Sequence, residues 1–166
     1  DALVNCAGIV RYGGLLEQTV EEFKEVLEVN LLGTFIVSRS VARLMIKNKK
    51  GNIVNISSIS GGKHPAISTG SYASSKAGVA MLSEQMSLEF GKEGIRVNTI
   101  LPGLFDTPLF AGAPDELKQS LGAQIPFPSR LGYPEEYATL ARHLCENEMM
   151  NGECIRLDGA IRMAPR

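Results

Sequence analysis

The chain has 166 residues, of which 44% are hydrophobic and 21% are charged, and its formal net charge is −1. This is the composition of an ordinary globular domain that is long enough to bury a sizeable core. A near-neutral charge without basic runs argues against nucleic acid as the main partner. No membrane partner is expected either, because no apolar run approaches the roughly 18 residues that span a bilayer.

The three cysteines and two histidines form no metal-binding or disulfide pattern. The cysteines lack C-x-x-C spacing and the histidines are far apart, so we expect reduced thiols in an intracellular protein, and no metal site. Cys6, Cys145 and Cys154 lie in strand-like or helix-like runs, where buried packing residues are expected rather than nucleophiles. His64 lies in a polar loop and is expected to be solvated.

The first half of the chain predicts one strand and one long helix. Residues Ala2–Asn5 form an apolar run that is typical of a strand. A helix is predicted from Thr19 to about Lys47, because Thr19 and Glu22 have the spacing of a capping box. Its expected apolar face contains Phe23, Val26, Leu27, Leu31, Val37 and Leu44. Asn30 interrupts this face, either as a polar residue bonded within its own helix at a kink or as a residue with a chemical role.

The second half alternates strands and helices. Strands are predicted at 53–56, 95–101 and Cys154–Leu157, and helices at 72–90, around 115–121, and from Pro134 onward. Ser57 and Ser58 directly follow the first of these strands, and Pro102-Gly103 follows the second. Strands that alternate with helices predict a parallel α/β sheet in a single domain.

Ser71-Tyr72-Ala73-Ser74-Ser75-Lys76 begins the longest of these helices. Tyr72 and Lys76 are four positions apart, so they share one helix face. A phenol with a pKa of about 10 is a poor base at neutral pH, but a nearby ammonium and the positive end of a helix both favour its ionised form. We therefore expect a lowered pKa for Tyr72. Taken alone, such a pair is also compatible with two exposed residues that share a face by accident.

The surroundings of the pair carry the stronger signal. In chain order the motifs are Asn5-Cys6-Ala7-Gly8, Asn30 within Val29-Asn30-Leu31-Leu32-Gly33, Ser58 after a strand, Tyr72-x-x-x-Lys76, and Pro102-Gly103 with Thr107-Pro108. This set resembles the short-chain dehydrogenase/reductase family. The resemblance implies a Rossmann-type doubly wound parallel sheet and an NAD(P)-dependent oxidoreductase, with NAD preferred and NADP left open.

The resemblance also implies a role for each matching residue. Tyr72 is the acid–base, Ser58 donates a hydrogen bond to the substrate oxygen, Lys76 assists Tyr72 and binds ribose hydroxyls, and Asn30 holds a water on a proton relay. Ser57 or Ser60 remains an alternative to Ser58. The implied cofactor-binding residues are Asn5, Ala7, Gly8, Ile56, Tyr72, Lys76, Pro102, Gly103, Leu104, Phe105 and Thr107.

Within the family, three stretches look like the type-2 3-hydroxyacyl-CoA dehydrogenase subfamily. They are residues 102–109, 124–132 and 151–163. This implies an acyl-CoA substrate, with a 3-oxoacyl carrier or a hydroxysteroid as alternatives, and a homotetramer. The segment from Gly8 to Thr19 is shorter than in animal mitochondrial members, so a cytoplasmic protein is expected, with the mitochondrial matrix as the alternative.

Two further expectations follow. An apolar substrate is expected because Leu104, Phe105, Leu109, Phe110, Ile125 and Phe127 lie in the segment after Gly103. Residues 1–166 are expected to be a partial domain, because the Gly-rich turn and first three strands of the family would precede Asp1. A truncated, non-catalytic oligomer subunit is therefore the rival interpretation. A serine hydrolase is disfavoured because no G-x-S-x-G occurs.

Overall fold

The computed structural model describes residues 1–62, 65–108 and 112–162. These residues contain four parallel strands in the order β1 (Ala2–Asn5), β2 (Gly51–Ile56), β3 (Ile95–Pro102) and β4 (Cys154–Leu157). Val4 pairs with Val54, Val54 with Asn98, and Ile100 with Ile155. Each neighbouring pair of strands is joined by a helical connection, as parallel strands require. The expected Rossmann-type parallel sheet is therefore confirmed.

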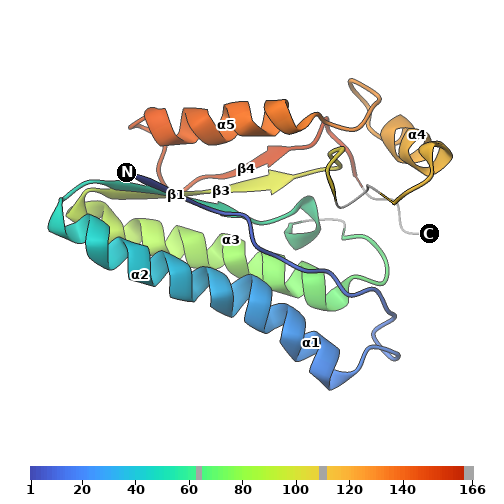
Figure 1. Ribbon diagram of the computed structural model, residues 1–166, viewed down its shortest axis with the longest axis horizontal. Coiled ribbons are helices and arrows are strands. Elements are labelled where there is room, and N and C mark those ends of the chain that lie inside the picture. The colour runs from blue at the N-terminus through green and yellow to red at the C-terminus, as the bar shows by residue number, and fades with distance from the viewer. Residues whose placement is uncertain (63–64, 109–111, 163–166) are drawn as a thin grey trace.

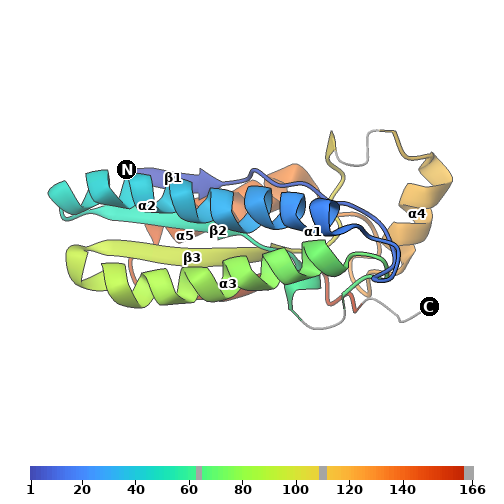
Figure 2. The same cartoon turned by 90° about the horizontal axis from the view of Figure 1, so that it is seen from below.

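The helices form two layers, one on each face of the sheet (Figure 1). One face carries α1 (Val20–Leu27), the π-helix η1 (Glu28–Leu32), α2 (Gly33–Lys47) and α3 (Gly70–Phe90), and the other carries α5 (Pro134–Glu146). Helix α4 (Asp115–Ala123) and the 3₁₀ turn η2 (Ile59–Gly61) lie beyond the carboxyl ends of the strands, and η3 (Gly91–Glu93) follows α3. Figure 2 shows α2 and α3 side by side in front of the sheet.

Each face of the sheet has its own hydrophobic core. Ile53, Ile95 and Val97 pack against α2 and α3, together with Ala42, Met45 and Met86. Val54 and Ile100 point the other way and pack with Leu144 of α5. This alternation follows from the two-residue period of a strand, and burial on both faces explains why β2 and β3 are almost continuously apolar.

The first long helix differs from the prediction in one respect. Its capping box between Thr19 and Glu22 is confirmed, and Asn30 lies in a π-turn that joins α1 to α2. Beyond that turn, however, the expected face residues Val37 and Leu44 are exposed, whereas small residues face the sheet. The small buried residues are Thr34, Ser38 and Ala42, and Met45 is buried after them. The extra residue in a π-turn rotates the following helix, and the small side chains then let α2 approach the sheet closely.

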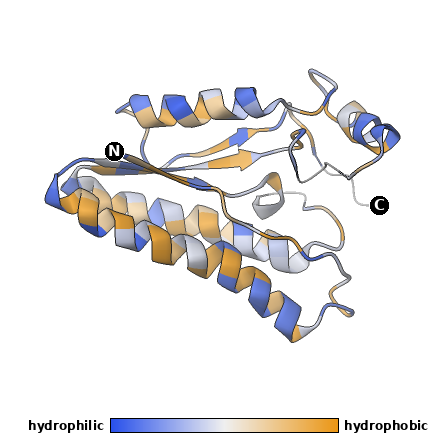
Figure 3. Cartoon of the chain, in the orientation of Figure 1, coloured by the Kyte–Doolittle hydropathy of each residue, from blue (hydrophilic) through white to orange (hydrophobic). Residues whose placement is uncertain are grey.

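As a result, the outer side of this helix is unusually apolar, and Figure 3 shows orange segments along much of α2 and α3. By length and composition alone, the continuous helical segment 20–47 is apolar enough to cross a membrane, which the sequence analysis did not expect. A helix that packs one side against a core passes the same test.

The cysteine prediction is partly wrong. Cys6 and Cys154 are exposed, because Cys6 follows the end of β1 and Cys154 begins β4, at the margin of the sheet. Cys145 is half-buried and packs against the cluster of Val54, Ile100 and Leu144. Among the described residues, no group of three or more histidine, cysteine or acidic side chains is arranged to hold a metal ion.

Candidate active site

The carboxyl ends of β1 and β2 and the first turn of α3 bring the predicted catalytic residues together. Ser58 directly follows β2, and Tyr72 and Lys76 lie in the first two turns of α3. Gly61 permits this approach, since a Cβ there would lie 2.5 Å from the carbonyl carbon of Lys76. Lys76, although charged, is only 5% exposed.

Lys76 is oriented by the end of β2. Its Nζ donates a hydrogen bond to the carbonyl oxygen of Ile56 at 2.8 Å, and lies 5.8 Å from the centre of the Tyr72 ring. Burial lowers the pKa of Lys76 to about 8, although nearby Cys6 acts in the opposite direction. The predicted proximity of this ammonium to the phenol is therefore found.

The expectation of a lowered pKa for Tyr72 is wrong for the chain by itself. Burial raises the pKa of Tyr72, and this effect outweighs the lowering effect of the nearby Ser58 side chain. The phenol of Tyr12 adds a smaller raising effect. The physical reason is that the free-energy cost of removing a phenolate from water is larger here than the stabilisation that its polar neighbours provide.

Ser58 is the serine that lies beside Tyr72. Its Oγ accepts a hydrogen bond from the backbone N–H of Ser60 at 3.1 Å, and its side chain is close enough to the Tyr72 phenol to lower the pKa of that phenol. Ser57 points elsewhere, because its buried hydroxyl donates to the carbonyl oxygen of Lys76 at 2.6 Å. The geometry therefore favours Ser58 over Ser57 as the hydroxyl that meets a substrate oxygen.

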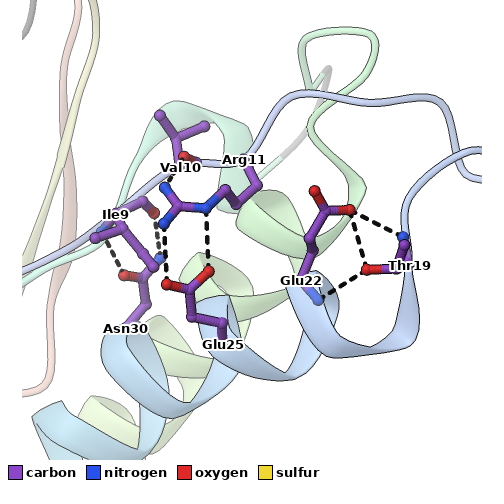
Figure 4. A network of polar contacts seen from close by, with 7 residues as sticks. All are labelled: Ile9, Val10, Arg11, Thr19, Glu22, Glu25 and Asn30. Atoms are coloured by element: carbon purple, nitrogen blue, oxygen red, sulfur yellow. Dashed lines mark hydrogen bonds and ion pairs between the residues drawn. The ribbon is translucent and has the colours of Figure 1, made fainter.

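Asn30 is fully buried and bonded on three sides. Its Oδ1 accepts from the backbone N–H of Ile9 at 2.8 Å, and its Nδ2 donates to the carbonyl oxygen of Ile9 at 2.9 Å (Figure 4). The same Nδ2 donates to the Ser75 hydroxyl at 3.0 Å. Both amide hydrogens are thus used by protein groups. The side chain joins the segment after β1 to α3, and its predicted role in a proton relay stays a prediction.

Two residues near the predicted cofactor site have structural contacts. The Asn5 amide donates to the Ser38 hydroxyl at 2.9 Å and to Oδ1 of Asn55 at 2.7 Å, so Asn5 joins β1 to α2 and β2. Gly8 lies where a Cβ would be 3.3 Å from the Asn30 carboxamide and 3.4 Å from Lys76 Nζ. Ala7 precedes it on the same segment. Their predicted contacts with a cofactor stay predictions.

The segment after β3 contains the other residues that were predicted to bind the cofactor, and their contacts with a cofactor stay predictions. Pro102 ends the strand, and Gly103 donates its N–H to Leu157 while approaching Asp158, where a Cβ would be 2.8 Å away. The Leu104 side chain packs with Ile59, Ile125 and Ile161. The Phe105 ring lies edge-on to Tyr137, with 5.9 Å between centroids. Thr107 is half-buried, and its contact with the carboxamide of a nicotinamide stays a prediction.

Three of the residues predicted to line an apolar substrate site, Leu104, Phe105 and Ile125, border a small cavity of about 120 Å³, and their contact with a substrate stays a prediction. Leu104 and Ile125 also pack with Ile59 and Ile161, and Phe105 packs against Tyr137 of α5. Phe127 is 81% exposed. Leu109 and Phe110 lie outside the described residues, as does His64.

Ser75 is a functional-site residue that the sequence analysis missed, and Ser57 was considered there only as an alternative to Ser58. The Ser75 hydroxyl donates to the carbonyl oxygen of Tyr72 at 2.7 Å and accepts from Asn30. The feature that marks both serines is a buried hydroxyl group beside Tyr72 and Lys76, and only the tertiary structure reveals this burial.

Comparisons with known proteins agree with this geometry. The family model for short chain dehydrogenases matches residues 1–118. The chain belongs to the short chain dehydrogenase family. This membership implies an oxidoreductase that uses a nicotinamide cofactor and acts on a small molecule.

Several relatives of this short chain dehydrogenase are named for related activities. It is 44% identical to the 3-hydroxyacyl-CoA dehydrogenase type-2 of Bos taurus, covering 99% of this chain and 67% of that protein. It is 37% identical to a 3-oxoacyl-[acyl-carrier-protein] reductase of Aquifex aeolicus, covering 97% and 65%. The chain thus spans about two thirds of the length of these relatives.

Solved structures give the same picture. A 3-hydroxyacyl-CoA dehydrogenase type-2 from Mycobacterium avium has a TM-score of 0.92 at 34% identity, over 99% of this chain and 68% of that one. A putative gluconate dehydrogenase from Agrobacterium tumefaciens has a TM-score of 0.89 at 31% identity, over 96% and 64%. That residues 1–166 form only part of a domain stays a prediction.

The residues present fit the nicotinamide half of the cofactor. Lys76 has three N–H groups, of which one donates to Ile56, so two remain for ribose hydroxyls. Gly8 leaves open the space next to that ammonium. Lys76 would hold the ribose, and the backbone near Gly8 and Pro102-Gly103 would flank it.

Proposed function

We propose that the complete protein oxidises 3-hydroxyacyl-CoA thioesters to 3-oxoacyl-CoA with NAD. The observation that carries the proposal is the group of Ser58, Tyr72 and Lys76 at the carboxyl edge of the sheet, where a half-buried phenol lies close to a serine hydroxyl and an ammonium. Open α/β sheets bind ligands at this edge. The substrate class is supported by relatives named 3-hydroxyacyl-CoA dehydrogenase.

Each side chain has a defined task in this reaction. Tyr72 Oη takes the proton of the substrate hydroxyl, and in reduction returns it. Ser58 Oγ donates to the substrate oxygen and so stabilises the charge that develops there. Lys76 stabilises the phenolate that forms, and its remaining N–H groups donate hydrogen bonds to the ribose hydroxyls. The nicotinamide ring, when bound, supplies the hydride acceptor.

The pKa values define when Tyr72 becomes basic. In the chain alone, burial holds the phenol protonated. A protonated Lys76 close to the phenol favours phenolate, whereas the neutral amine does not. Because burial lowers the Lys76 pKa to about 8, anything that favours the ammonium also favours the phenolate. We infer that ribose hydroxyls, as added hydrogen-bond acceptors, raise the Lys76 pKa and thereby help Tyr72 ionise.

A 3-oxoacyl carrier reductase that uses NADP is the second candidate. It is favoured by the 37% identity to the Aquifex aeolicus enzyme of that name. A sugar-acid substrate is a third outcome worth excluding, given the structural similarity to a putative gluconate dehydrogenase. Cytoplasmic location stays a prediction.

Steady-state kinetics on the complete protein tests the proposal. We expect 3-hydroxybutyryl-CoA with NAD to have a higher kcat/KM than 3-hydroxybutyryl-CoA with NADP, a 3-hydroxyacyl carrier protein, or gluconate. A preference for the carrier protein with NADP selects the second candidate. A preference for gluconate rejects the acyl substrate altogether.

We also propose that the protein self-associates through the outer side of α1–α2 and α3, as part of a homotetramer. An apolar groove of about 700 Å³ lies there, lined by Leu27, Glu28, Leu31, Leu32, Phe35, Gly78, Met81, Leu82 and Gln85. Met81 is 65% exposed and Ile36 is 52% exposed. Exposed apolar surface of this extent is typical of protein interfaces.

The spacing of side chains on this face matches a second copy of itself. Glu28, Leu32, Phe35 and Arg39 follow one another along one side of the helix. A two-fold axis between Leu32 and Phe35 would place each against the other in the partner. The same axis would bring Glu28 against the Arg39 of the second copy. An isologous contact of this kind satisfies charge and apolar surface together.

A further inference from the structure

A second exposed apolar patch lies at the carboxyl edge of the sheet, apart from the groove. It consists of Tyr12, Leu15, Leu16 and Ile67, which are 75%, 76%, 103% and 58% exposed. They belong to the segment between β1 and α1 and to the segment before α3. Figures 1 and 2 both show these two segments side by side at the end where α3 begins.

The patch is held in a fixed place. Gly13 donates its N–H to the carbonyl oxygen of Ser68 at 3.0 Å and forms a parallel bridge with Thr69. Leu15 contacts Gly70, where a Cβ would be 2.3 Å from the leucine Cδ2. The segment is also tied to α1 by Arg11, whose guanidinium donates twice to Glu25 (Figure 4). The segment therefore crosses the first turn of α3 in a defined register.

This register places the patch next to the reacting groups. The bridge at Thr69 lies three residues before Tyr72, and Tyr12 immediately precedes the bridged Gly13. The phenol of Tyr12 is close enough to that of Tyr72 to influence its ionisation. The described residues that were expected to meet an acyl chain are divided: Leu104, Phe105 and Ile125 pack within the fold, whereas Phe127 is exposed.

We propose that Tyr12 and Leu16, with Ile67 beside them, form the surface that binds the acyl chain of the substrate and set its preferred length. The inference rests on the proposed function, since the substrate oxygen must lie at Ser58 and Tyr72 for its chain to reach this patch. A flexible apolar chain gains by covering exposed leucine and tyrosine side chains, because both surfaces leave water. A polyol would lose hydrogen bonds to water there without replacing them.

The inference makes a quantitative prediction about chain length. Full burial of one methylene group contributes about 0.8 kcal/mol, which corresponds to about a fourfold gain in kcat/KM. A chain lying on a partly open surface gains less per methylene. We therefore expect kcat/KM to rise by about twofold per added methylene until the patch is covered.

The experiment compares the complete wild-type protein with its Tyr12→Ser and Leu16→Ser variants. The Met149→Ser variant is the matched control, because Met149 is 91% exposed and lies between α5 and β4, at the opposite edge. Two substrate series are used with NAD: 3-hydroxyacyl-CoA thioesters of 4 to about 10 carbons, and 2-alkanols of similar lengths. Thermal melts check that every variant is folded.

The expected result is a smaller rise of kcat/KM per methylene in both Tyr12 and Leu16 variants, in whichever series is turned over, and an unchanged rise in Met149→Ser. Chain-length dependence equal to that of the wild type in both patch variants would overturn the inference, and would leave the patch as a surface for another protein. If only 2-alkanols are oxidised, the proposed acyl-CoA function fails, while the alkanol series still decides the role of the patch. If neither substrate series is turned over, the proposed function and the inference about the patch are both overturned.

Discussion

The Asn30 carboxamide and the Ser75 hydroxyl are 3.0 Å apart inside the molecule, although 45 residues separate them in sequence. Ser75 passes this contact on by donating to the carbonyl oxygen of Tyr72. The π-turn that carries Asn30 also carries Leu31 and Leu32, which line the outer groove. One turn of helix therefore connects the proposed self-association surface with the helix that bears Tyr72 and Lys76.

Replacing Asn30 should destabilise the protein strongly. Asn30→Ala removes three hydrogen bonds and leaves both backbone groups of Ile9 without their partner. Unsatisfied buried polar groups cost about 1–3 kcal/mol each, so we expect a loss of about 3 kcal/mol in the free energy of unfolding. Urea unfolding of the complete protein measures it. Asn48→Ala, at the exposed end of α2, is the control; equal stabilities of the two variants would contradict the clamp role of Asn30.

Tyr72→Phe should abolish most of the chemistry. The variant keeps the ring but has no hydroxyl to transfer a proton, so turnover should fall by a factor of at least about 100, the low end for general acid–base catalysis. Cofactor binding, measured by calorimetry, should survive. Lys76→Ala should impair both properties. Tyr133→Phe, at a half-exposed tyrosine on α5's N-cap, should change neither. Wild-type turnover in Tyr72→Phe would refute the assignment.

Lys76 should titrate abnormally in the cofactor-free protein. Its folded pKa of about 8 lies below the unfolded value of 10.5, so between these values the unfolded state binds more protons. The contribution of Lys76 to stability therefore rises with pH across this window and is smallest below pH 8. NMR of lysine labelled at the Cε carbon should reveal one resonance with a midpoint near 8. It should be missing in Lys76→Met, and its persistence there would disprove the assignment.

Charge reversal on the outer face should control self-association. Glu28→Arg places two cations together across the proposed two-fold axis, and Arg39→Glu places two anions together there. Each single variant should therefore shift the complete protein toward smaller assemblies in sedimentation experiments, and Glu28→Arg combined with Arg39→Glu should restore the wild-type distribution. Lys118→Glu, on α4, is a control outside this face. Wild-type assembly in both single variants would exclude this face as the contact.

The chain of residues 1–166, expressed by itself, should be poorly soluble. Within the described residues β1 pairs only with β2, so its other edge offers free backbone groups, and such edges promote aggregation. The described residues also include no Gly-rich turn for a pyrophosphate. We expect NAD affinity no better than millimolar, which is about 4 kcal/mol of binding free energy. A cooperative thermal melt together with micromolar NAD binding would show instead that the chain is self-sufficient.

Local patterns in the sequence determined most of the elements. The capping box at Thr19, proline at the first position of α5 and β-branched runs in β2 and β3 act within a few residues, so their effects can be read along the chain. The spacing of four residues between Tyr72 and Lys76 likewise places both side chains on one face of the helix. The parallel sheet followed from the alternation of these elements.

What only the tertiary structure decided depends on groups distant in sequence. Burial of the Tyr72 phenol reversed the expected shift of its pKa, because desolvation depends on everything packed around it. Leu104 and Ile125 were expected to line a substrate site, and only the tertiary structure shows that they also pack with Ile59 and Ile161. Asn30 had two possible roles in the sequence, and its contacts with Ile9 and Ser75 became visible only when three separate segments met around one buried amide.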